Sequence, residues 1–145
     1  MECEQLYKAI VDQASDAIIF ADPQGLIRLW NAGAEAIFGF SSTEALNQSL
    51  DLIIPADLRR AHWAGFEFAM KASHTKYGRK VMTTRSMNKK GETIYVNLSF
   101  SIVVDGSGTP MGAMAQARDF TARYLEEKRL RKQVEDLERR VKEGK

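Results

Sequence analysis

Apolar and polar positions follow several different periods along this chain, and each period predicts one kind of element. Within residues 1–14 the apolar side chains have helical spacing, so a short amphipathic helix is expected there. Two apolar runs, residues 17–21 and 26–30, flank a turn at residues 22–25 whose proline and glycine favour a tight reversal. Together they predict a β-hairpin.

Helix signals fill the next part of the chain. Asn31 fits the N-cap of a short helix that ends at Gly39, and residues 41–44 carry a second capping signal. Beyond a proline, residues 56–73 place most of their apolar side chains near one stripe, which predicts a longer amphipathic helix.

The following segment changes to the period of strands. Three strands are expected at about residues 79–86, 93–103 and 111–118, joined by turns at residues 88–91 and 105–108. In the middle strand apolar and polar residues alternate, which indicates a sheet with one buried face. The element order predicts an α+β domain in which short helices cover one face of a five-stranded antiparallel sheet.

A heptad pattern follows the last strand. Leu130, Val134, Leu137 and Val141 are spaced four, three and four residues apart, with valine at a and leucine at d, as in a two-stranded coiled coil. We expect residues 122–145 to form a signalling helix that depends on dimerisation, because so short a seam is marginal alone. The alternative is an amphipathic helix that folds back on its own domain.

Composition narrows the class of protein. With 145 residues and 44% hydrophobic residues, the chain suits one folded domain with an extension. A net charge of +2 is too small to favour nucleic acid as the partner. Cys3 is the single cysteine, the acidic start lacks a signal-peptide pattern, and no run approaches the roughly 18 apolar residues of a membrane span. A cytoplasmic protein without direct membrane contact is expected.

Catalytic motifs do not occur in the sequence. It has no Gly-Lys-Ser/Thr phosphate loop, no His-Glu-x-x-His and no nucleophile elbow. Two histidines without a placed cysteine do not make a zinc site, and no other metal site is expected. The chain is therefore expected to be a regulatory domain, with any catalytic output domain outside it.

Three segments resemble motifs of PAS sensory domains. Residues 31–41 (Asn-Ala-Gly-Ala-Glu-Ala-Ile-Phe-Gly-Phe-Ser) are similar to the family's helix motif, Lys89-Lys90-Gly91 to its hairpin turn, and Arg118-Asp119-Phe120-Thr121 to its exit motif. The resemblance covers residues 5–121 and places the PAS domain itself at residues 15–121. It implies a sensory and dimerisation module that holds haem, flavin, a small metabolite or nothing.

The resemblance also implies a place in signalling. PAS domains usually precede kinases, cyclases or similar outputs, so an output domain is expected in the same protein, either a sensor histidine kinase or a cyclic-dinucleotide enzyme. The signal is expected to leave through Arg118, Asp119, Phe120 and Thr121 into a homodimer of helices. Asp119 is expected either to pair with a basic group or to cap the helix beyond it.

The ligand is less defined by the resemblance than the fold is. Light-oxygen-voltage PAS domains need a reactive cysteine in an Asn-Cys-Arg motif. Because Cys3, the single cysteine, lies outside the fold, this subtype is excluded, and non-covalent flavin stays open as a weaker alternative. Residues 57–62 resemble the helix that carries the proximal histidine of haem-binding PAS oxygen sensors, which implies His62 as an iron ligand. Met82, near the distal-arginine position of those sensors, is either a sixth ligand or a core residue. His74 is expected at the surface.

Small residues in the last strand suggest a pocket. Ala113, Ala115 and Ala117 share one face, and if they face the helices they leave volume for a ligand. The alternative is that Trp30, Phe66, Phe68 or Phe100 fills this volume, which leaves a ligand-free dimerisation or interaction module. The expected pocket residues are Phe38, His62, Phe66, Tyr77, Met82, Leu98, Phe100 and Met114.

Overall fold

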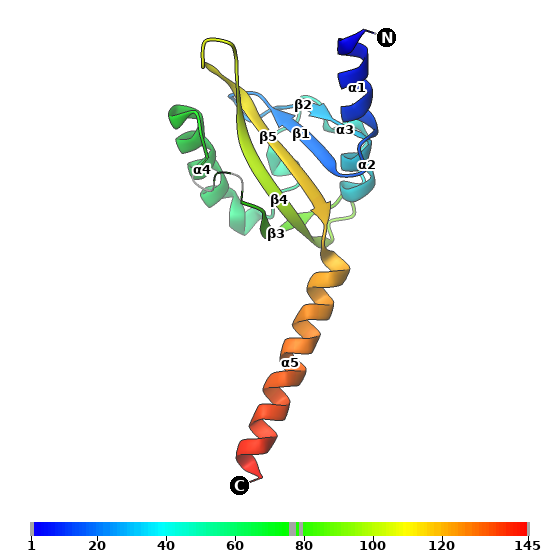
Figure 1. The fold of residues 1–145 in the computed structure, drawn as a ribbon, viewed down its shortest axis with the longest axis vertical. Coiled ribbons are helices and arrows are strands. Elements are labelled where there is room, and N and C mark those ends of the chain that lie inside the picture. The colour runs from blue at the N-terminus through cyan, green and yellow to red at the C-terminus, as the bar shows by residue number, and fades with distance from the viewer. Residues whose placement is uncertain (1, 76–77, 79, 145) are drawn as a thin grey trace.

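A computed structural model of the chain describes residues 2–75, 78 and 80–144. Its sheet has five strands: β1 (Ala17–Ala21), β2 (Ile27–Trp30), β3 (Met82–Met87), β4 (Thr93–Val104) and β5 (Pro110–Asp119). Their order is β2-β1-β5-β4-β3, and every neighbouring pair is antiparallel (Figure 1). The expected α+β architecture is confirmed.

Some helices cover one face of this sheet, and others extend from it. They are α1 (Cys3–Gln13), α2 (Ala32–Phe38), α3 (Ser42–Ala45), α4 (Arg59–Ala72) and α5 (Thr121–Glu143), with 3-10 turns η1 (Leu50–Leu52) and η2 (Ala56–Leu58). The segments from α2 to α4 connect β2 to β3 and supply the helices that cover the sheet, whereas α5 projects away from it (Figure 1). Within the described part of the chain, no helix is both long and apolar enough to cross a bilayer.

The largest differences from the predicted boundaries are at the starts of β3 and α4. β3 begins at Met82, because Lys80 and Val81 lie outside the strand, and residue 79 is outside the described residues. The longer helix begins as the 3-10 turn η2, becomes α-helical at Arg59 and ends where Ser73 adopts a left-handed φ of 60°.

The core lies between the inner face of the sheet and the helices. On this face, Ala17, Ile19 and Ala21 of β1 pair with Ala117, Ala115 and Ala113 of β5, and all but Ala115 are buried. Small alanines on both strands leave room for large side chains such as Phe38 and Ile27, and both are almost fully buried. This half of the domain is closely packed.

Asn31 connects three elements through one buried side chain. Its Oδ1 accepts hydrogen bonds from the backbone N–H of Ala34, which caps α2, and from that of Ile18 in β1. Its Nδ2 donates to the carbonyls of Val11, near the end of α1, and Asp16, next to β1. The predicted N-cap is confirmed, and the same amide also fixes how α1 enters the domain.

Candidate ligand site and signal exit

The inner face of the sheet becomes more accessible halfway along β4. Ile94 and Val96 are buried at its start, whereas Leu98, Phe100 and Ile102, on the same face, are only partly buried. These three residues pair with the alanines of β5 and belong to the same apolar cluster as Phe66 of α4. The small side chains that predicted a pocket therefore lie opposite apolar residues that solvent still reaches.

An aromatic group on α4 borders this region. The His62 ring lies 4.7 Å from the Trp63 ring and 6.1 Å from the Phe66 ring, measured between centroids. The Nδ1 atom of His62 is buried, and no described residue forms a hydrogen bond with it. Burial lowers the pKa of His62, an effect that the carboxylate of Asp51 partly offsets. The imidazole is therefore neutral near pH 7, the form that binds metal.

Trp63 fixes α4 against the hairpin of β1 and β2. Its Nε1 donates a hydrogen bond of 2.8 Å to Asp51 Oδ1, and its ring lies against Gly25. A Cβ on Gly25 would lie 2.3 Å from the ring, and Gly25 has a φ of 82°. Only glycine satisfies both the close approach and the left-handed backbone.

The structure brings together some of the expected pocket residues and separates others. Met82 pairs with Leu98, so both lie on the inner face together with Phe100. Phe38 is also inside, but it is 1% exposed and its ring packs 5.6 Å from that of Trp30. It therefore belongs to the closely packed half of the core.

Met114 does not join this group. It pairs with Phe20 and Ser101, so it lies on the outer face of the sheet, opposite to Ala113 and Ala115. The expectation that it lines the pocket is wrong, because neighbouring residues of a strand point to opposite faces. Phe68 is 53% exposed and does not fill the inner space. Tyr77 lies outside the described residues.

A groove of about 520 Å³ lies beside α4 and was not predicted from the sequence. Among the residues that the structure describes, Phe66 is the only expected pocket residue that lines it. Its lining residues are Pro23, Gln24, Trp63, Phe66, Glu67, Met70, Lys71 and Pro110. They come from the β1–β2 turn, α4 and the start of β5, segments that a sequence pattern cannot place side by side.

The signal exit is bonded to the start of β4 at Tyr95. The Tyr95 N–H donates to Thr121 Oγ1 at 3.0 Å, and the Phe120 N–H donates to the Tyr95 carbonyl at 2.8 Å. The Tyr95 ring also stacks on that of Tyr124, with centroids 3.8 Å apart. The first turn of α5 is thus fixed to its own sheet.

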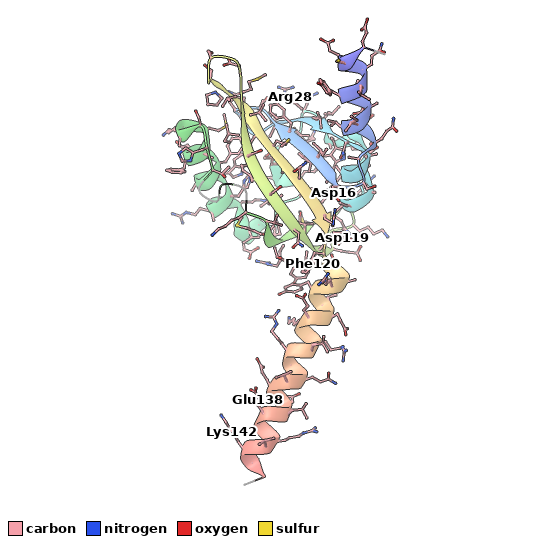
Figure 2. All side chains as sticks on the ribbon, viewed as in Figure 1. Asp16, Arg28, Asp119, Phe120, Glu138 and Lys142 are labelled. Atoms are coloured by element: carbon pink, nitrogen blue, oxygen red, sulfur yellow. The ribbon has the colours of Figure 1, made fainter. Side chains whose placement is uncertain are left out.

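Asp119 takes one of the two roles expected of it, whereas its neighbour Arg118 forms an ion pair. Asp119 Oδ1 accepts from the backbone N–H of Thr121 at 2.9 Å and so caps the start of α5. Arg118 forms the ion pair: its guanidinium donates to both carboxylate oxygens of Asp16 at 3.0 and 3.2 Å, which raises the pKa of Arg118. Asp16, Asp119 and Phe120 lie around the place where β5 passes into α5 (Figure 2).

Comparison with known protein families gives the fold its name. The model of the PAS fold matches residues 5–120. The chain belongs to the PAS family. Solved PAS structures agree with this assignment: the PAS domain of a Colwellia psychrerythraea protein covers 83% of this chain with a TM-score of 0.72 and 20% identity. A sensory box histidine kinase/response regulator from Burkholderia thailandensis covers 92% with a TM-score of 0.65 and 18% identity. These two chains are themselves covered to 99% and 98%.

Curated relatives of this PAS domain are signalling proteins. Over 55 residues, 38% of the chain, it is 34% identical to the sensor protein FixL of Bradyrhizobium diazoefficiens. Over 54 residues, 37% of the chain, it is 35% identical to the cell-division control histidine kinase PdhS of Brucella ovis. The matched segments span 11% of FixL and 5% of PdhS. The chain therefore spans only a small part of the length of these relatives.

Proposed function

We propose that this PAS domain is the sensory part of a signal-transduction protein that binds haem or a small apolar ligand between α4 and β4. The observation that supports this most directly is the change in burial along β4. Leu98 and Phe100 face the helices but stay partly accessible, near an α4 whose His62 presents a buried nitrogen without a hydrogen-bond partner among the described residues. An apolar wall with one unsatisfied polar group is typical of a ligand site.

The output of the protein is proposed from its relatives. FixL is named a sensor protein and PdhS a histidine kinase, so we favour a sensor histidine kinase in the same chain over a cyclic-dinucleotide enzyme. The signal would pass from β5 through the Tyr95–Thr121 joint into a dimeric α5. A ligand that stabilises one arrangement of the sheet would shift the population of helix arrangements.

The residues beside α4 fit a haem group. His62 offers a neutral imidazole, and Met82, on the inner face with Leu98, offers a thioether. Both are iron ligands in haem proteins. Haem held by His62 alone would supply an iron that takes a gaseous ligand, and the apolar side chains of Leu98 and Phe100 would help to exclude water.

Haem titration tests this proposal. Purified protein is expected to develop a Soret band at one haem per chain, and His62→Ala is expected to lose or shift it. His74→Ala is the matched control, because His74 is exposed beyond the end of α4 and is expected to leave the band unchanged. Absence of a Soret shift in the wild type, or equal spectra for wild type and His62→Ala, would exclude His62 as the ligand.

The second candidate is a ligand-free interaction module, favoured by the filled core around Phe38 and Ile27. It predicts a colourless protein whose melting temperature does not change with haem, with flavin or with small apolar compounds. A rise in melting temperature with any of these would contradict this candidate, because a ligand that binds only the folded state must stabilise it.

A further inference from the structure

An exposed apolar stripe runs along the second half of α5. Leu130, Val134, Leu137 and Val141 are 45–64% exposed, and no residue of α5 is buried. Side chains project on all sides of this helix as it leaves the sheet (Figure 2). Four such residues along one face of a helix need a cover, and the spacing by heptads indicates that the cover is another helix.

The stripe does not reach the sheet. Counting the heptad back from Leu130, the next a and d positions are Glu127 and Arg123, and these two side chains pair with each other at 3.4 Å. Charged residues at such positions disfavour close apolar packing. This first part of α5 is instead held by its own domain, since Tyr124 stacks on Tyr95. The apolar seam therefore starts at Leu130.

A hollow on α5 lies at the start of this seam. It is lined by Glu127, Leu130, Arg131, Val134 and Glu135. In the heptad these residues hold defined positions: Glu127 is a, Leu130 is d, Arg131 is e and Val134 is the next a. In a parallel coiled coil, four residues at these positions surround a d-position side chain of the partner helix. In a symmetric dimer the residue that enters this hollow would be the partner's Leu130.

The charges beside the seam complement a second copy of the chain. Glu126 holds a g position and Arg131 an e position, so in a parallel dimer each Glu126 faces the partner's Arg131 five residues further on. The next such pair is Gln133 with the partner's Glu138, which carries no repulsion. Valine at a with leucine at d is also the combination that favours two parallel strands.

We propose that a second copy of this chain packs against α5 in parallel and in register, with the apolar seam starting at Leu130 and the helices separate between Phe120 and Leu125. The inference rests on the proposed dimeric α5 and adds its orientation, its register and its starting point. The charged segment around Arg123 and Glu127 would thus join two parts of α5, a first part that moves with the sheet and a second part that moves with the partner's helix.

Disulfide trapping tests the register and the starting point. In a Cys3→Ser background of the full chain, Leu130→Cys is expected to form a disulfide-linked dimer. Two controls are expected to react at least about tenfold more slowly: Lys132→Cys, on the far side of the helix, and Arg123→Cys, at a d position above the seam. Equal rates for Arg123→Cys and Leu130→Cys would contradict the starting point, and a dimer in which Leu130→Cys does not cross-link would contradict the register.

Charge exchange tests the orientation while leaving the apolar seam intact. Glu126→Arg and Arg131→Glu are each expected to raise the dimer dissociation constant about fivefold to tenfold, and the double variant to restore it. Lys132→Glu, with the same change of charge outside the seam, is expected to have little effect. If the double variant does not restore the dimer dissociation constant, only the parallel orientation is overturned. A wild-type chain that sedimentation shows to be a monomer would overturn both this inference and the dimeric α5 of the proposed function.

Discussion

The side-chain amide of Asn31 is 2% exposed and makes hydrogen bonds in α1, β1 and α2. Its polar atoms can be buried at little cost because each has a backbone partner. A smaller apolar residue in this place would leave the N–H groups of Ile18 and Ala34 without their acceptor. The entry of α1 would also lose its attachment to the domain.

Asn31→Ala is therefore expected to lower the free energy of unfolding by about 2–4 kcal/mol, the sum of a lost cap and of unsatisfied buried groups. Urea unfolding followed by circular dichroism measures this change. Ser41→Ala is the matched control, because Ser41 caps α3 at an exposed site and should cost less than about 1 kcal/mol. Equal losses for the two variants would show that Asn31 acts as a simple cap.

His62 makes the stability of the domain depend on pH. Its pKa is lowered by burial, so below the unfolded value of about 6.5 the unfolded chain binds more protons than the folded one, and stability falls as the pH decreases. The carboxyls with lowered pKa, such as those of Asp57 and Glu44, act below about pH 5 and do not overlap with this range.

Between pH 7.5 and pH 5.5 the wild type is expected to lose up to about 1 kcal/mol, less than a fully buried histidine would cause because the ring is partly exposed. Urea unfolding at both pH values checks this. His62→Gln should flatten the dependence, whereas His74→Gln should preserve it. A dependence that persists in His62→Gln would assign it to other groups.

At the scale of elements, the contact of Gly25 with Trp63 positions α4 relative to the β1–β2 hairpin. Gly25→Ala adds a methyl group at 2.3 Å from the indole ring in addition to backbone strain. A loss of about 3–4 kcal/mol in thermal or urea unfolding is expected. Gly91→Ala isolates the strain, because Gly91 has a φ of 80° and an added methyl group would meet no atom within 4 Å, and it should cost about 1–2 kcal/mol. If the two variants lost similar free energies of unfolding, α4 would be able to move away from the β1–β2 turn without cost.

At the scale of the whole molecule, the apolar stripe of α5 predicts the oligomeric state. Leu137→Lys places a charge at a d position and is expected to raise the dimer dissociation constant at least about a hundredfold, so that the mass in sedimentation falls to that of one chain. Lys132→Ala lies outside the stripe and should keep the wild-type mass. An unchanged mass in Leu137→Lys would exclude the stripe as the interface.

The sequence predicted the fold well because short-range patterns define its elements. Strand alternation, the Asn31 cap and the turn glycines are local signals, and each led to the correct element. The site was predicted less completely. Alternation along β5 places Met114 on the face opposite to Ala113 and Ala115, so a local pattern already contradicted the prediction that it lines the pocket. The groove beside α4, in contrast, joins three segments far apart in sequence. Such features follow from tertiary packing and leave little trace in a local pattern.

The first residue of β1 pairs with Ala117 of β5, next to the ion pair of Asp16 with Arg118, so the chain enters and leaves the sheet at one place. A mechanical tension between α1 and α5 would therefore act on this end of the ladder alone. Its hydrogen bonds lie across the strands and would break one after another, as in a zipper, instead of sharing the load. After the bonds of Asn31 to Val11 and of Tyr95 to Thr121 had broken, the Asp16–Arg118 pair would carry the load, and the domain would yield at low force.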